Sequence, residues 1–171
     1  TPGHGKPRIL FLGFLRTASS LLEEMQRHAP DLINDTAVID FSPAARGGLM
    51  ERKVRVIYGD ISQRDTLLHA GIEHAEVIIC TVPDSVLKGT TNERLVRLLR
   101  GLNPEARIIA TAEVLTQVKV LIAAGADYVS VGRLRAAQDL TEAVRAVPGG
   151  FAGENREGLE GTASGRGGCE G

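Results

Sequence analysis

The chain has 171 residues, which is enough for one domain with a hydrophobic core. Hydrophobic residues make up 43% of it and charged residues 24%, as in ordinary globular proteins. The formal net charge of −1 gives no basic excess, so nucleic acid is not an expected partner. The longest apolar runs, 9–12 and 77–82, are far shorter than the ~20 residues of a membrane-spanning helix.

Short β-branched runs alternate six times with segments of helical periodicity. We expect strands at 8–12, 37–41, 54–58, 77–82, 107–112 and 128–131. The expected helices cover 18–27, 44–52, 64–70, 88–100, 115–124 and 134–147. This alternation predicts an α/β fold of one domain, with a Rossmann-like, doubly wound, parallel six-stranded sheet.

The composition changes near the carboxyl end. We predict that residues 1–147 form the Rossmann-like domain and that residues 148–171 form a glycine-rich, disordered tail. Residues 149–171 hold 9 of the 20 glycines and very few large apolar side chains. Such a segment buries too little apolar surface to offset the entropy lost on ordering.

Cysteine and histidine give no sign of a metal centre. Cys80 lies in an apolar strand run and is expected to be buried, whereas Cys169 lies in the glycine-rich segment. Two cysteines so placed make neither a disulfide framework nor a zinc site. The four histidines show no metal-ligand spacing, so we predict no metal site.

The turn after the first strand departs from the G-x-G-x-x-G dinucleotide fingerprint. Gly13 keeps the first glycine, while Leu15 and Ala18 stand at the second and third positions. The Leu15 side chain would stand where a diphosphate approaches, yet the next helix still offers free N–H groups to a phosphate. The candidate phosphate-binding residues are Gly13, Phe14, Leu15, Arg16, Thr17, Ala18 and Ser19. The alternative is an ordinary strand-to-helix turn capped by Thr17.

In a doubly wound sheet, ligands bind at the carboxyl ends of the strands, near the switch in strand order. Asp40, followed by Phe41, ends the second strand, where a carboxylate can accept both ribose hydroxyls of an adenosine. Its alternative role is to cap the next helix.

Two further strand ends complete the candidate site. Asp60, followed by Ile61, ends the third strand. It could receive the adenine amino group or cap the helix expected at 64–70, and the sequence supports both roles equally. Thr81 and Val82 end the fourth strand, where their groups would cover the sugar–phosphate side of a ligand.

The order of these pieces resembles the RCK domain (regulator of potassium conductance), also called the TrkA N-terminal domain. The segments that carry the resemblance are 38–40, 56–62, 67–79, Asn92, 103–104, 108–112 and 121–131. The run from Gly59 through Ala70-Gly71-Ile72 is the most specific part. The turn at 13–20 resembles most closely the cytoplasmic domains of bacterial cation:proton antiporters.

The resemblance implies a nucleotide, AMP, ADP, ATP or NAD(H), bound at 13–20, Asp40 and Asp60. It also implies a homodimer that passes its ligand state to a membrane transporter domain of the same full-length protein. We therefore expect a nucleotide-sensing regulatory domain, not an enzyme, of a potassium or sodium/proton antiporter or a potassium channel. We expect it at the cytoplasmic face of the bacterial inner membrane, as a piece of a larger membrane protein.

Two alternatives of other classes stay open. One is a structural dimerisation module without a ligand, since the missing glycines put a dinucleotide in question. The other is an NAD(P)-dependent oxidoreductase, which is disfavoured because neither Tyr58 nor Tyr128 has a lysine four residues on. A phospho-receiver domain is disfavoured too, because residues 13–14 provide no acidic pair after the first strand.

Overall fold

The structure, a computed structural model, describes residues 5–146. The predicted tail at 148–171 lies outside these residues. The chain divides into two compact units, one that ends at Val131 and one that begins at Gly132. The first unit contains the whole sheet, and the described part of the second is the helix α6 (Gly132–Ala146).

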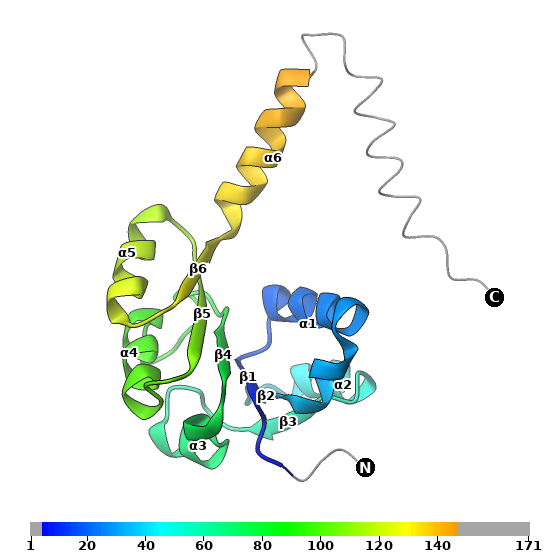
Figure 1. The fold of residues 1–171 in the computed structure, drawn as a ribbon, viewed down its shortest axis with the longest axis vertical. Helices are drawn as coiled ribbons and strands as arrows, with labels where there is room; N and C mark the ends of the chain where they lie inside the picture. Colours follow the sequence, from blue (N-terminus) through cyan, green and yellow to red (C-terminus); the bar gives the residue numbers. More distant parts are fainter. Residues whose placement is uncertain (1–4, 147–171) are drawn as a thin grey trace, which may run out of the picture. The chain divides into compact units, whose positions relative to one another are not determined.

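The first unit is a parallel sheet of six strands in the order β3-β2-β1-β4-β5-β6 (Figure 1). This arrangement confirms the predicted Rossmann-like, doubly wound fold. The strands are β1 (Ile9–Leu12), β2 (Thr36–Asp40), β3 (Arg55–Tyr58), β4 (Val77–Cys80), β5 (Arg107–Ala112) and β6 (Tyr128–Val131). The helices are α1 (Arg16–His28), α2 (Pro43–Glu51), α3 (Arg64–His69), α4 (Asn92–Leu102) and α5 (Leu115–Ala124), with 3-10 turns at Pro30–Asp35 and Ile72–His74.

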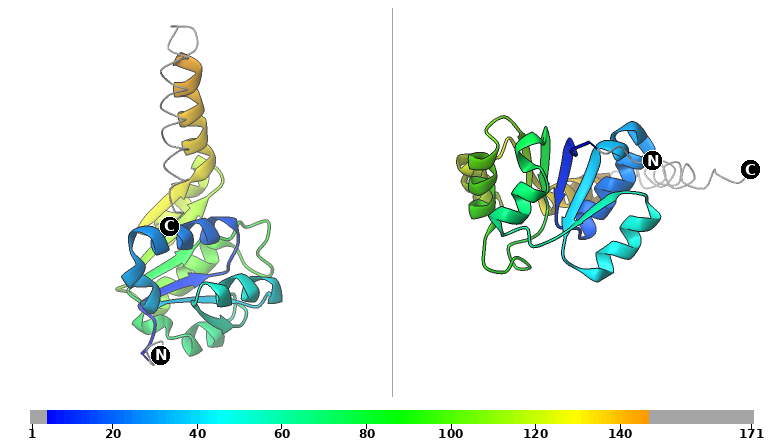
Figure 2. Two further views of the ribbon diagram at one scale, coloured as in Figure 1. Left: turned by 90° about the vertical axis from the view of Figure 1, so that its right-hand side faces the viewer. Right: turned by 90° about the horizontal axis from the view of Figure 1, so that it is seen from below.

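Helices cover both faces of the sheet: α1 and α2 lie on one face, and α4 and α5 lie on the other (Figures 1 and 2). Successive β1 residues point to opposite faces. Phe11 packs in the cluster that holds Leu22 of α1 and Leu49 of α2. Leu10 belongs to the other cluster, which includes Leu95 of α4. Each such buried side chain stabilises the fold by about 1.5–3 kcal/mol.

Helix α4 begins at Asn92, four residues after the start expected from the sequence. Gly89 has a φ of 73°, which a right-handed helix does not allow. Thr91 then caps the helix, its side chain accepting a hydrogen bond from the Arg94 N–H at 3.3 Å. The segment 81–91 is therefore a loop at the carboxyl end of β4, and it reaches the candidate site.

Candidate functional site

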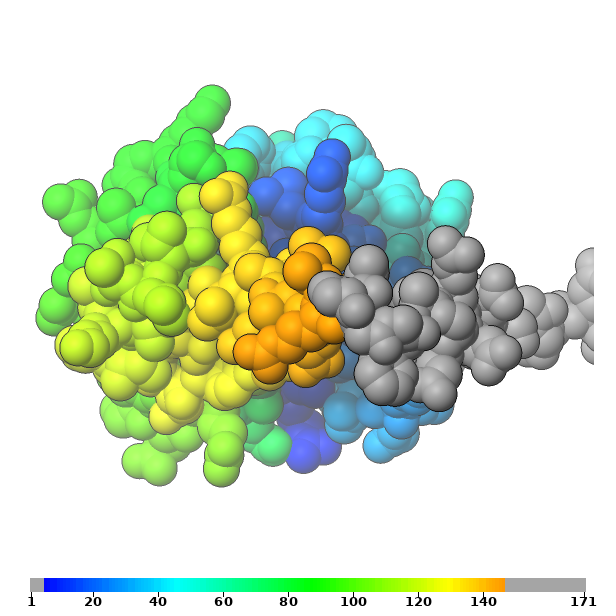
Figure 3. Space-filling view, turned by 90° about the horizontal axis from the view of Figure 1, so that it is seen from above, coloured from blue at the N-terminus to red at the C-terminus, as the bar shows by residue number. Residues whose placement is uncertain are grey.

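A pocket of about 340 Å³ lies at the carboxyl ends of the first four strands. β1 and β4 are neighbours there, although their connections run to opposite sides of the sheet. Seen from above in Figure 3, the blue and cyan residues of the β1–β3 half lie beside the green residues of the β4–α5 half. The pocket is lined by Gly13, Phe14, Leu15, Asp40, Phe41, Ser42, Asp60, Ile61, Ser62, Val82, Val86, Leu87, Lys88 and Thr90.

The pocket brings together eight of the site residues predicted from the sequence, namely Gly13, Phe14, Leu15, Asp40, Phe41, Asp60, Ile61 and Val82. A neighbouring hollow of about 600 Å³ adds Arg16 and Ser19. Three predicted residues line neither space: Ala18 and Thr81 are buried, and Thr17 is exposed on α1. The sequence analysis gave no role to Val86 and Leu87, which precede the helix expected from residue 88 and line the pocket.

Gly13 is required by the shape of the turn. Its φ of 78° lies in the left-handed region, and a Cβ there would clash with the Val82 side chain. Its N–H donates to the Ile39 carbonyl at 2.8 Å, which continues the β1–β2 pairing into the turn. The one fingerprint glycine that remains therefore lets the β1 turn pass close to the end of β4.

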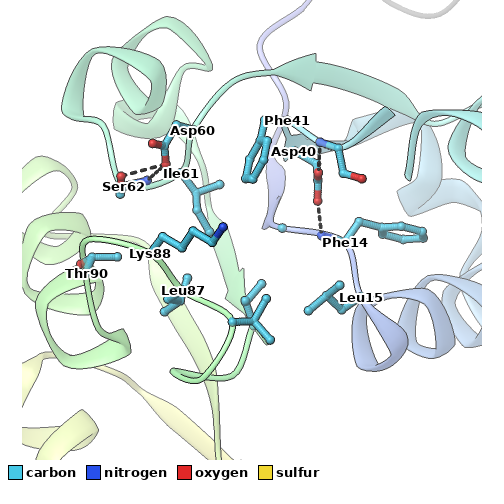
Figure 4. Close-up of a pocket in the computed structure, with 14 residues that line it drawn as sticks. Phe14, Leu15, Asp40, Phe41, Asp60, Ile61, Ser62, Leu87, Lys88 and Thr90 are labelled. Carbon is cyan, nitrogen blue, oxygen red and sulfur yellow. Dashed lines mark hydrogen bonds between the residues drawn. The ribbon is translucent and has the colours of Figure 1, made fainter. Parts of the chain in front are cut away.

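Asp40 joins two of the loops that line the pocket (Figure 4). Its Oδ2 accepts the Phe14 N–H at 2.8 Å, and its Oδ1 accepts the Ser42 N–H at 2.6 Å. Helix α2 has no side-chain cap, so the capping role left open for Asp40 is not the one in the structure. Each carboxylate oxygen still has acceptor capacity for a ribose hydroxyl.

Asp60 shapes the turn that follows β3. Its Oδ1 accepts both the N–H and the hydroxyl of Ser62, each at 2.8 Å. The helix α3 begins after Gln63 without a side-chain cap, so Asp60 does not cap it. Its Oδ2 has no hydrogen-bond partner in the described part of the chain, and it is therefore open to a donor such as an adenine amino group.

The start of α1, where the sequence predicts phosphate contact, is partly obstructed. Leu15 is the cap residue and provides no side-chain hydrogen bond, so Thr17 does not cap the helix either. The first-turn N–H groups have no partner within the helix and can receive an anion. However, Leu15 is 40% exposed and borders the pocket. The Phe14 N–H is already donated to Asp40.

The loop between β4 and α4 is held in place by a buried asparagine. Asn92 is 5% exposed, and its Nδ2 donates to the Val82 carbonyl at 2.7 Å and to Asp84 Oδ1 at 2.8 Å. The Asn92 N–H donates to the same Asp84 oxygen at 2.7 Å. These bonds fix both ends of the loop that carries Lys88 and Thr90 to the pocket.

Within residues 5–146, no group of three or more histidine, cysteine, aspartate or glutamate side chains could hold a metal ion. None of the helices in that range is long and apolar enough to cross a membrane. Burial raises the pKa of Cys80 to about 12, so this thiol is not an activated nucleophile.

A parallel sheet in this order, with a pocket at its switch point, defines a Rossmann-type domain. The chain belongs to the TrkA-N domain family, whose sequence profile matches residues 9–131. The resemblance seen in the sequence is thereby confirmed.

Among curated proteins, the chain is 28% identical over 141 residues to the putative cation/proton antiporter YbaL of Escherichia coli strain K12. The match covers 82% of this chain and 24% of that protein, so the chain spans about a quarter of its length. The solved TrkA-N domain of the inner membrane protein YbaL from Escherichia coli matches with a TM-score of 0.70 and 27% identity, over 82% of this chain and 98% of that one. The GsuK RCK domain matches with a TM-score of 0.67 and 29% identity, over 85% of this chain and 30% of that one.

Proposed function

We propose that this chain is the nucleotide-sensing regulatory domain of a monovalent cation/proton antiporter or a potassium channel. The observation that carries the proposal is the pocket at the switch between β1 and β4, with Asp40 and Asp60 at its edge. Family membership supports the regulatory role, and the similarity to the antiporter YbaL supports the kind of transport protein. The transported ion is potassium or sodium in this proposal.

The bound ligand is an adenine nucleotide in this proposal, and its parts match the groups that border the pocket. Asp40 accepts the ribose hydroxyls, while the free Oδ2 of Asp60 accepts from the adenine amino group. Phe41 and Ile61 supply apolar walls for the base (Figure 4). GsuK has been solved bound to NAD and bound to ADP, and both structures share this fold.

The mechanism that we propose is a shift between two arrangements of a homodimer. A nucleotide that binds one arrangement more tightly moves the equilibrium toward it, and the attached membrane domain responds. In this proposal the domain lies at the cytoplasmic face of the inner membrane. A catalytic role is disfavoured because Tyr58 has no lysine four residues on and is 71% exposed at the sheet edge.

A thermal-shift panel of AMP, ADP, ATP, NAD and NADH tests the proposal. Selective stabilisation by one nucleotide identifies the ligand, because a ligand that binds only the folded state raises its melting temperature. The absence of any shift, together with a dimer in solution, would favour the structural dimerisation module instead.

The variant Asp40→Ala tests the binding mode. We expect nucleotide affinity, measured by calorimetry, to fall by about 1.5–3 kcal/mol, because a charged hydrogen-bond acceptor is lost. The control Asp65→Ala removes an acidic side chain of α3 that does not line the pocket, and it should leave the affinity unchanged. Equal affinities for Asp40→Ala and the unaltered protein would remove the ribose role from Asp40.

A further inference from the structure

We infer that Lys88 binds the phosphate of the nucleotide, in the role that a glycine-rich loop has in dinucleotide sites. The inference rests on the proposed function and concerns the class of ligand. It makes the ligand a mononucleotide, with the phosphate directed toward the β4–α4 loop. Four features of the pocket support it.

The first feature is the position of the side chain. Lys88 lies in the loop before α4 and lines the same pocket as Asp40 and Asp60. In Figure 4 its side chain extends from the loop into the pocket, toward the side from which Asp40 and Phe41 come. Among residues 5–146, it is the one lysine or arginine that lines this pocket.

The second feature is that this cation is not neutralised by the protein. Two carboxylates border the pocket, yet Lys88 forms neither a hydrogen bond nor an ion pair with any residue in 5–146. Asp40 accepts the N–H groups of Phe14 and Ser42, and Asp60 accepts Ser62 through Oδ1, so neither carboxylate is bonded to the Lys88 ammonium group. The ammonium group is therefore free for an anionic group of the ligand.

The third feature is the loop that presents Lys88. Asn92 fixes it to the Val82 carbonyl and to Asp84, and the N–H groups of Val86 and Leu87 both donate to the Pro83 carbonyl. Because both ends of the loop are held by hydrogen bonds, the backbone of Lys88 is fixed beside the pocket. This is what a recognition residue requires.

The fourth feature is that the usual phosphate site is obstructed. The Leu15 side chain stands before the start of α1, and the Phe14 N–H is donated to Asp40. A diphosphate that bridges two nucleosides would have to pass this point. A single adenosine phosphate, with its ribose on Asp40, can instead turn its phosphate to Lys88.

The test compares AMP with adenosine, which lacks the phosphate, by calorimetry on the unaltered protein and on Lys88→Gln. We expect Lys88→Gln to weaken AMP binding about 10-fold or more, since a charge-assisted bond is lost. Adenosine binding should stay within about 2-fold, because the apolar walls and Asp40 are unaltered. Lys88→Arg should retain most of the AMP affinity. Lys119→Gln, on an exposed site of α5 outside the pocket, is the matched control.

The outcomes separate this inference from the proposed function. Equal losses for AMP and adenosine would mean that Lys88 only shapes the pocket, and unchanged AMP binding would mean that it does not contact the phosphate. Either result overturns the inference and leaves the proposed nucleotide site intact. If neither compound binds the unaltered protein, the proposed function fails and the inference fails with it.

Discussion

Asp40 connects two of the loops that line the pocket. Its two carboxylate oxygens hold the Phe14 and Ser42 N–H groups at 2.8 and 2.6 Å, so the ends of β1 and β2 are joined through one side chain. A carboxylate fixed in this way loses little further freedom when it accepts ribose hydroxyls. One of these bonds uses the Phe14 N–H, a backbone donor that a glycine-rich loop would instead offer to a diphosphate.

Leu15 is the residue that we propose obstructs the binding of a dinucleotide. Its backbone is extended, with φ −119° and ψ −164°, and glycine is a better helix cap than leucine. We expect Leu15→Gly to keep the fold and to improve NADH affinity about 10-fold, since the obstructing side chain is removed. The measurement is calorimetry with NADH, and AMP serves as the control whose affinity should change little. If NADH binding does not improve, the Leu15 side chain is not the obstacle to a dinucleotide. The Phe14 N–H, which is donated to Asp40 and so is not available to a diphosphate, is then the stronger one.

Elements with regular apolar patterns were predictable. The sequence pattern places all six strands to within two residues of their observed bounds. The central strands β1 and β4 are continuously apolar, as parallel strands covered on both faces are. Because alternating strands and helices form a parallel sheet, Asp40, Asp60 and Val82 lie at the same edge of it.

The rest of the site depends on contacts between segments that are distant in the chain. The loop before α4 is held by Asn92 through partners eight and ten residues away, and no periodic pattern reports such bonds. Asn103 is similar: it is buried, and its Nδ2 donates to the Ile72 and Ala75 carbonyls at 2.8 Å. Side chains that satisfy distant backbone groups are therefore visible only in the folded chain.

The end of α2 offers a test of the fold at the level of one element. The Lys53 N–H donates to the Met50 carbonyl and the Val54 N–H to the Leu49 carbonyl, which is the Schellman arrangement. Lys53 occupies its left-handed position with a φ of 57°, where glycine is usual. We expect Lys53→Gly to raise the free energy of unfolding by about 0.5–1 kcal/mol, measured by urea denaturation. Arg52→Gly, at a right-handed position, should lower it and serves as the comparison.

At the scale of the whole molecule, the sheet unit contains every residue assigned to the pocket. The family profile ends at Val131, and the second unit begins at Gly132. Described by itself, α6 has no buried residue, and Leu140 and Val144 are 66% and 68% exposed. In the proposed function, the sheet unit therefore binds the nucleotide. The response is proposed for a longer protein, since the chain spans about a quarter of the length of YbaL.

The most direct test of the proposed nucleotide pocket is a titration of the ¹⁵N-labelled chain with AMP, followed by amide NMR shifts. We expect the largest shifts at the amides of Phe14, Ser42 and Ser62, because these N–H groups are bonded to Asp40 and Asp60. The shifts should saturate, and they should be lost in Asp40→Ala. AMP binding in this pocket would be ruled out if saturating AMP left these three amides unmoved, or moved only amides of α5 and β6.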